Sequence, residues 1–178
     1  MKKIFILLSR TNTIPARFVR SLTVGEFSHV SISLLPRTDT FYSYARRKVN
    51  NPLVAGFICE NIHDGIFAKY PETHCAVYSI NVSDDSYSKA ERTIKILSKN
   101  KDKATYSFLG AIAMRVGIKL KRRYKFTCSQ FVAVVLNKIG DISLPKDPYL
   151  MLPNDFAKIP NIELVYDGPL KNCVISGS

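Results

Sequence analysis

The stretch KFTCSQFVAVVL (residues 125–136) predicts a buried helix that opens with a cysteine. Thr127 is followed three residues later by Gln130, just ahead of an apolar run, and this capping-box signature places the helix start here. Cys128 is then expected at the helix N-terminus, where unpaired N–H groups and the helix dipole favour an anion. Its thiol should ionise more readily than a free one, and the thiolate is the form that attacks carbonyl carbon. The alternative is a small apolar residue opening a core helix.

Length and composition indicate one globular domain over residues 1–178. The chain is 46% hydrophobic and 22% charged, and it has no linker-like tract. Its apolar runs are too short for a transmembrane helix. Lys2 and Lys3 before the run at residues 4–8 imitate a signal peptide, but the run is short and no cleavage site follows it, so a cytoplasmic protein is expected. Four cysteines without regular spacing predict reduced thiols.

The net charge of +12 is concentrated in a basic cluster at residues 119–125, directly before the cysteine helix, with a second cluster at residues 46–48. Such a run is usually a solvated loop. The functional alternative is an electropositive rim that attracts an anionic substrate, anionic lipid or nucleic acid. No nucleic-acid-binding motif accompanies the charge, so no nucleic-acid partner is expected.

Strand-like and helix-like stretches alternate along the chain without internal repeats. Strands are expected at residues 3–8, 27–35, 40–45, 54–60, 74–82 and 162–166. Helices are expected from residue 12 or 13 to 22, from 84 to about 98, and at 106–116, 128–139 and 154–158. A basic loop is expected at residues 46–52, a bulge at Gly56, and turns at 61–73. Strands grouped in the first half and helices in the middle predict an α+β fold, an antiparallel sheet with helices on one side.

One histidine is predicted to share a site with the cysteine. Alternation in the strand at residues 27–35 places His29 at its start, on the polar face. A thiol at a helix N-terminus facing an imidazole on an adjacent strand is the Cys–His pairing of papain-like hydrolases, and it needs no proximity in sequence. His29 precedes Cys128 here, whereas in papain the nucleophile comes first.

Two motifs carry a resemblance to a known superfamily. FSHVSIS (residues 27–33) is similar to the "s-H-v-g-i" strand, and FTCSQFV (126–132) to the "y-x-C-S-x-f-v" helix start, of the circularly permuted branch of the NlpC-type papain-like superfamily. This branch includes the YiiX-like proteins and lecithin retinol acyltransferase. YSFLG (106–110), PNDF (153–156) and LVYDG (164–168) extend the likeness over most of the chain. The resemblance implies a permuted papain-like fold, with Cys128 as nucleophile and His29 as the residue that accepts and returns its proton.

The third residue, which would orient the imidazole, has two candidates. The family carries a polar residue on the strand after the histidine strand, and there this chain has Ser43 where a histidine is usual. Glu60, at the end of the next strand, is the chemical alternative, because a carboxylate orients the ring and stabilises an imidazolium better than a hydroxyl does. Both candidates stay open. The backbone N–H of Cys128 is a candidate oxyanion donor.

No cofactor or metal is expected. Cys59, His63, His74 and Cys75 include metal-ligating residue types, but His74 and Cys75 are neighbours on a predicted strand and point to opposite faces. Cys59 and Cys75 are interpreted as core thiols and Cys173 as a tail residue. The candidate substrate contacts are Tyr106, Tyr124 and Ser129, and the two tyrosines fit helix packing equally well.

The function expected from these features is a thiol hydrolase, of the peptidase or amidase type, that cleaves an amide or ester through a thioacyl-enzyme. A lipid acyl hydrolase or acyltransferase is an alternative, since the apolar residues at 109–116 would suit an acyl chain, although they also suit helix packing. The substrate would be peptide-like or an acyl lipid. A second alternative is a non-enzymatic binding module for an anionic ligand.

Overall fold

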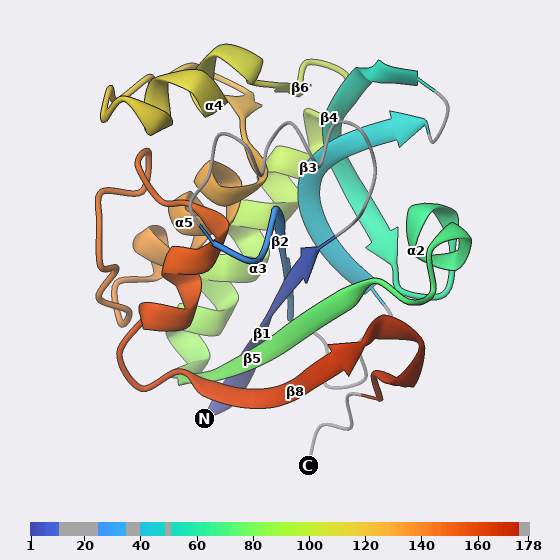
Figure 1. The fold of residues 1–178 in the computed structure, drawn as a ribbon. Helices are drawn as coiled ribbons and strands as arrows, with labels where there is room; N and C mark the ends of the chain where they lie inside the picture. Colours follow the sequence, from blue (N-terminus) through green and yellow to red (C-terminus); the bar gives the residue numbers. More distant parts are fainter. Residues whose placement is uncertain (11–24, 35–39, 49–50, 175–178) are drawn as a thin grey trace.

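A computed structural model describes residues 1–10, 25–34, 40–48 and 51–174. Its main feature is a six-stranded antiparallel sheet in the order β4-β3-β2-β1-β5-β8 (Figure 1). The strands are β1 (Lys2–Arg10), β2 (His29–Ser33), β3 (Thr40–Lys48), β4 (Asn51–Asn61), β5 (His74–Val82) and β8 (Glu163–Pro169). The short strands β6 (Thr105–Tyr106) and β7 (Lys125–Phe126) form a separate parallel pair. The helices are α2 (Gly65–Lys69), α3 (Asp84–Lys99), α4 (Phe108–Arg115) and α5 (Cys128–Ile139), with 3-10 turns η1 (Pro153–Lys158) and η2 (Leu170–Asn172).

The central strand β1 explains why its sequence is apolar on both faces. Ile4, Ile6 and Leu8 belong to the core cluster between the sheet and helices α3 and α5. Phe5 and Leu7 point the other way, into a smaller cluster that includes residues of α2 and η2. Since successive side chains of a strand alternate between faces, a strand covered on both sides must be apolar throughout.

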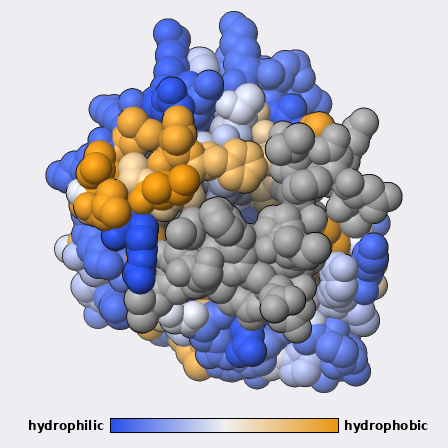
Figure 2. Space-filling view, turned by 45° about the horizontal axis from the view of Figure 1, so that its top comes forward, coloured by the Kyte–Doolittle hydropathy of each residue, from blue (hydrophilic) through white to orange (hydrophobic). Residues whose placement is uncertain are grey.

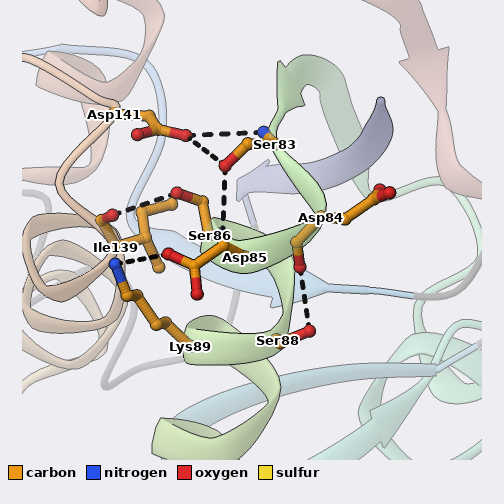
Figure 3. A network of polar contacts seen from close by, with 8 residues as sticks. All are labelled: Ser83, Asp84, Asp85, Ser86, Ser88, Lys89, Ile139 and Asp141. Atoms are coloured by element: carbon orange, nitrogen blue, oxygen red, sulfur yellow. Dashed lines mark hydrogen bonds and ion pairs between the residues drawn. The ribbon is translucent and has the colours of Figure 1, made fainter.

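Helices α3 and α5 lie side by side against one face of the sheet (Figure 1). A polar network joins the start of α3 to the end of α5 (Figure 3). The carboxylate of Asp141 accepts a 2.9 Å hydrogen bond from the Ser83 hydroxyl, and Ser86 donates to the carbonyl of Ile139 at 3.0 Å. This network satisfies polar groups that the two helix ends leave unpaired, and it helps to fix α5, the helix that carries Cys128.

The predicted α+β class, with an antiparallel sheet and its main helices on one side, is confirmed. Several boundaries differ from the prediction. The expected basic loop at residues 46–52 is largely strand, because β3 and β4 continue pairing toward Lys48 and Asn51, with a register shift between Arg46 and Lys48. Gly56 pairs regularly with Ala45 and is not the bulge. A Cβ at Gly56 would lie 2.1 Å from the carbonyl oxygen of Ala104, so glycine permits a close backbone approach there.

Two further predictions about helices need correction. Helix α4 begins at Phe108, not at residue 106, because residues 105–106 pair with β7 and the Ser107 hydroxyl caps the helix by accepting from Gly110 N–H. Helix α2, capped by Asp64, lies in the stretch expected to hold only turns. The helix predicted from residue 12 or 13 to 22 lies outside the described residues. In the described ranges, no helix combines the length and apolar character needed to cross a bilayer.

Candidate active site

Cys128 is the first residue of α5, and its position is fixed by a reciprocal capping box. Thr127 Oγ1 accepts from the Gln130 N–H at 3.1 Å, and Gln130 Oε1 accepts from the Thr127 N–H at 3.1 Å. The Gln130 side chain also donates to the Tyr149 carbonyl at 3.3 Å. These reciprocal hydrogen bonds fix the first turn of α5, so Cys128 lies at the helix N-terminus, where backbone N–H groups lack helical partners. Cys128 is 4% exposed.

His29, the first residue of β2, contacts a carboxylate from a strand two positions away in the sheet. Its Nε2 lies 2.8 Å from Oε1 and 3.0 Å from Oε2 of Glu60. The His29 side chain is 15% exposed and that of Glu60 is 11% exposed, so the pair is largely shielded from water. Since Nε2–H donates to the carboxylate, Nδ1 is the ring nitrogen left to face another partner.

The imidazole also interacts with Cys128, because a hydrogen bond and charge between the two side chains shift the pKa of both groups. Burial disfavours the imidazolium, but the negative charge of Glu60 and hydrogen bonds with Cys128 and Glu60 outweigh it and raise the pKa of His29 to about 10. Burial also disfavours the thiolate, yet the hydrogen bond and charge of His29, with further hydrogen bonds from the Val30 backbone and Ser129, lower the pKa of Cys128 below its usual 9.0. The two groups therefore favour a thiolate–imidazolium pair.

The two candidates for the third position differ clearly in their contacts. Glu60 pairs with Phe41 across β4 and β3, and its side chain reaches over β3 to the ring of His29. The buried hydroxyl of Ser43 instead donates a 2.7 Å hydrogen bond to the carbonyl of Val30. Ser43 thus contacts the backbone beside His29, whereas Glu60 contacts the imidazole itself. These contacts favour Glu60 over Ser43 as the orienting residue, because a neighbouring strand position does not fix where a short side chain reaches.

Of the three expected substrate contacts, one lies beside the sulfur. The Ser129 hydroxyl is 3.9 Å from the Cys128 sulfur. Burial and the charge of Cys128 raise the pKa of Tyr106, and the Tyr106 ring lies 5.0 Å from the ring of Phe108. Tyr124 occupies the turn before β7 in a left-handed backbone conformation (φ 57°) and packs against the core cluster, so it serves the local fold.

An asparagine to which the sequence analysis gave no role binds the backbone of the chain just before His29. Asn154, in η1, accepts from the Phe27 N–H at 3.1 Å and donates to the Phe27 carbonyl at 3.0 Å. Gly25 makes room for this clamp, since a Cβ there would lie 2.3 Å from Asn154 Cγ. The PNDF segment was the available signal, but its partner is 127 residues away in sequence.

The remaining histidines and cysteines lie in other surroundings. His74 contacts the carboxylates of Glu26 and Asp167 at 3.3 and 2.9 Å. Cys75 and Cys173 are buried on the opposite side of the sheet from α5, and their thiols share a hydrogen bond. Cys173, interpreted from the sequence as a tail residue, is thus part of a core cluster, whereas Cys59, interpreted as a core thiol, is exposed. Within the described part of the chain, no three His, Cys, Asp or Glu side chains are grouped as metal ligands.

Comparison with known proteins adds no family assignment. No protein-family model matches the chain, and no curated protein matches it. The inference of function therefore depends on the geometry and electrostatics of the site.

Proposed function

We propose that this chain is a cysteine hydrolase of the permuted papain-like type, which cleaves an amide or ester bond through a thioacyl-enzyme on Cys128. One observation carries the proposal. His29 bridges the carboxylate of Glu60 and the sulfur of Cys128 at the N-terminus of α5. Nucleophile, proton carrier and orienting carboxylate in this order form the arrangement that thiol hydrolases need.

The first half of the reaction uses the resting ion pair. The Cys128 thiolate attacks the carbonyl carbon and forms a C–S bond, while the carbonyl π electrons move to oxygen. The backbone N–H of Cys128, unpaired at the helix N-terminus, is positioned to stabilise this oxyanion. The C–N or C–O bond then breaks, and the leaving group takes the proton of the His29 imidazolium, which leaves an acyl thioester and a neutral imidazole.

The second half regenerates the enzyme with water. Neutral His29 removes a proton from water as the oxygen attacks the thioester carbonyl, and collapse of the tetrahedral intermediate breaks the C–S bond. The products are a carboxylic acid and a Cys128 thiolate paired with the His29 imidazolium. Glu60 acts through the ring, because its negative charge stabilises the protonated imidazole and its two oxygens hold Nε2 in place.

The electrostatic arrangement argues against a purely structural role for these residues. Shielding a carboxylate, an imidazole and a thiol from water costs free energy, and a core of similar shape is built more simply from apolar side chains. Strongly perturbed pKa values in a cluster of ionisable groups are typical of functional sites. The lowered pKa of Cys128 is the feature that a structural His–Glu pair would not require.

Trapping of the acyl-enzyme tests the proposal. The protein is mixed with an activated ester such as p-nitrophenyl acetate, quenched in acid and examined by peptide mass spectrometry. We expect a burst of nitrophenol and an acetyl group on Cys128 that hydroxylamine removes. A Cys59→Ser variant, which removes an exposed thiol, should behave like the wild type. Acetylation spread over surface lysines, with no burst and no adduct on Cys128, would point to a non-enzymatic binding module.

A further inference from the structure

The region around α4 carries an unusual concentration of exposed apolar side chains. Eleven large hydrophobic residues are exposed in the described part of the chain, and five of them lie within residues 108–118. This α4 patch consists of Phe108, Leu109, Ile112, Val116 and Ile118, which are 47% to 64% exposed. Scattered single exposed apolar residues are normal, but a contiguous group on one element indicates an interaction surface.

The patch is a second apolar face of α4, separate from the face that packs on the domain. Leu109, Ile112 and Val116 follow one another at helical spacing along one side of the helix and its C-cap. Gly110 and Met114 are the buried residues of α4, and the Met114 sulfur accepts from the Thr127 hydroxyl at 3.6 Å. Figure 2, in which the top of Figure 1 comes forward, shows orange side chains gathered over α4 beside strongly hydrophilic ones.

The charge that borders the patch is mainly positive. The segment from Lys103 to Gly140 contains no aspartate or glutamate. Its basic residues nearest the patch are Arg115, Lys119, Lys121, Arg122, Arg123 and Lys125, all of them exposed. Lys119 pairs with Asp147 at 2.9 Å, but among the described residues Arg115 and Arg122 lie within ion-pair distance of no carboxylate. Positive charge is therefore available to an external anionic partner.

The patch also adjoins the candidate active site. Its first member, Phe108, lies 5.0 Å ring to ring from Tyr106, which pairs with Phe126, two residues before Cys128. The basic cluster at residues 119–125 leads directly into β7, the strand that precedes α5. Strand β7 pairs with β6, the strand that precedes α4. A partner seated on α4 would therefore lie next to Cys128.

We propose that the α4 patch docks the protein onto the surface of an anionic lipid bilayer. Apolar side chains on one helix face can enter the boundary between headgroups and acyl chains, while bordering lysines and arginines contact lipid phosphates. An anionic bilayer matches both the α4 patch and its mainly positive border. A second copy of the chain is disfavoured, because it would bring an equally positive rim against the first, in a protein of net charge +12. In this orientation Tyr106, which contacts Phe108 of the α4 patch, would face the lipid.

Flotation with vesicles tests the proposal. One set of vesicles contains phosphatidylcholine alone, and the other contains phosphatidylcholine with phosphatidylserine. We expect binding to the phosphatidylserine vesicles that weakens as salt is added, and weak binding to the neutral ones. The double substitution Leu109→Ser with Ile112→Ser should reduce binding by about tenfold or more. The same change at two exposed residues elsewhere, Ile96 on α3 and Leu164 on β8, should leave it unchanged.

A second pair of variants examines the charge. Arg115→Gln with Arg122→Gln should weaken binding to phosphatidylserine vesicles by about tenfold, whereas Lys95→Gln with Lys99→Gln on α3 should have little effect. Thermal unfolding checks that each variant is folded. Cys128→Ser should bind vesicles as the wild type does, so loss of hydrolysis and loss of docking are separate results.

Three outcomes would overturn membrane docking. The first is no flotation of the folded wild type with phosphatidylserine vesicles. The second is equal loss of binding in the patch variants and their α3 and β8 controls. The third is a concentration-dependent dimer in gel filtration that only the Leu109→Ser, Ile112→Ser variant abolishes, without vesicle binding, since this would make the patch a contact between copies.

Discussion

Two buried cysteine sites on opposite sides of the sheet differ in what surrounds the sulfur. Cys128 opens a helix and faces the ring of His29, and the pKa of its thiol is lowered. Cys75 shares a hydrogen bond with the Cys173 thiol, and this bond, together with burial, raises the pKa of Cys75. Burial acts to raise the pKa of Cys128, Cys75 and Cys173 alike, so the difference between the sites comes from the partner of each thiol. An imidazole backed by a carboxylate, at a helix N-terminus, is what favours the reactive form at Cys128.

The largest expected effect comes from removing the imidazole, which should make Cys128 resemble Cys75. In His29→Ala, the Cys128 thiol loses the partner that stabilises its anion. A thiol with an ordinary pKa near 9 is only about 1% ionised at pH 7, so alkylation of Cys128 by iodoacetamide at pH 7 should slow by about a hundredfold. Ester hydrolysis should fall by about a thousandfold. Peptide mass spectrometry measures the alkylation of each cysteine separately.

The control for this substitution is His63→Ala, which removes an exposed histidine in the turn before α2. It should leave both the alkylation of Cys128 and ester hydrolysis unchanged. An equal effect of the two substitutions would show that the difference between the cysteine sites does not come from His29.

The next effect separates the two candidates for the orienting residue. Glu60→Gln keeps the size of the side chain but removes the negative charge that raises the pKa of His29, so the pKa should fall toward its ordinary 6.5 and kcat/KM should drop by about tenfold to a hundredfold. Ser43→Ala should cost about 1 kcal/mol of unfolding free energy through the lost bond to Val30 and leave the pH profile of kcat/KM in place. A shifted profile in Ser43→Ala alone would reverse the assignment.

The thiolate–imidazolium pair also predicts how stability depends on pH. The raised pKa of His29 adds stability that is present below pH 6.5 and is lost as the pH rises through about 10. The lowered pKa of Cys128 adds stability that is present above pH 9.0 and is lost as the pH falls through the folded value. In the part of the range from pH 6.5 to 9.0 that lies above the folded pKa of Cys128, both folded and unfolded states hold one proton on these two groups, so their joint contribution should be nearly flat.

The variant Cys128→Ala breaks this balance, because only the extra proton on His29 remains. Its unfolding free energy, relative to the wild type, should fall with rising pH over the same window, by up to about 1.4 kcal/mol per pH unit. Denaturant unfolding at several pH values measures the difference. Cys75→Ala, at the other cysteine site, should show a constant difference from the wild type.

The smallest effect on catalysis is expected from the loss of the hydrogen bonds between Asn154 and the Phe27 backbone, just before β2. Asn154→Ala removes two hydrogen bonds to the Phe27 backbone and should cost about 1 to 3 kcal/mol of unfolding free energy. As a positioning residue, Asn154 should also lower kcat more than it raises KM, because His29 follows Phe27 by two residues. Asn137→Ala, at an exposed asparagine in the last turn of α5, is the control, and it should leave kcat unchanged.

Local signals in the sequence were enough to predict the start of α5 and the alternation of β2. The Thr127–Gln130 capping box and the αL glycine at Gly140 act within one helix, and both are observed. The serines of β2 that the alternation assigns to a polar face are buried, because the second face of the sheet is also covered. Alternation predicts which side chains share a face, and only the full fold determines whether water reaches it.

The features that the sequence did not predict depend on contacts distant along the chain. The sequence left Glu60 and Ser43 open as the partner of His29, and it did not predict that Asn154 holds Phe27 or that Cys173 meets Cys75. The longer β3 and β4 arise from mutual pairing, which outweighs the loop-like composition of residues 46–52. Propensity and periodicity act over a few residues, so they cannot determine which distant side chains meet.

The central claim is that His29 holds Cys128 as a thiolate. The most direct measurement is the pH dependence of alkylation at each cysteine of the folded wild type, resolved by peptide mass spectrometry. We predict that the rate at Cys128, whose pKa is lowered, holds to a lower pH than the rate at Cys59, whose pKa is raised by partial desolvation and by the charge of Glu60. A Cys128 rate that falls in parallel with that of Cys59 would contradict the account.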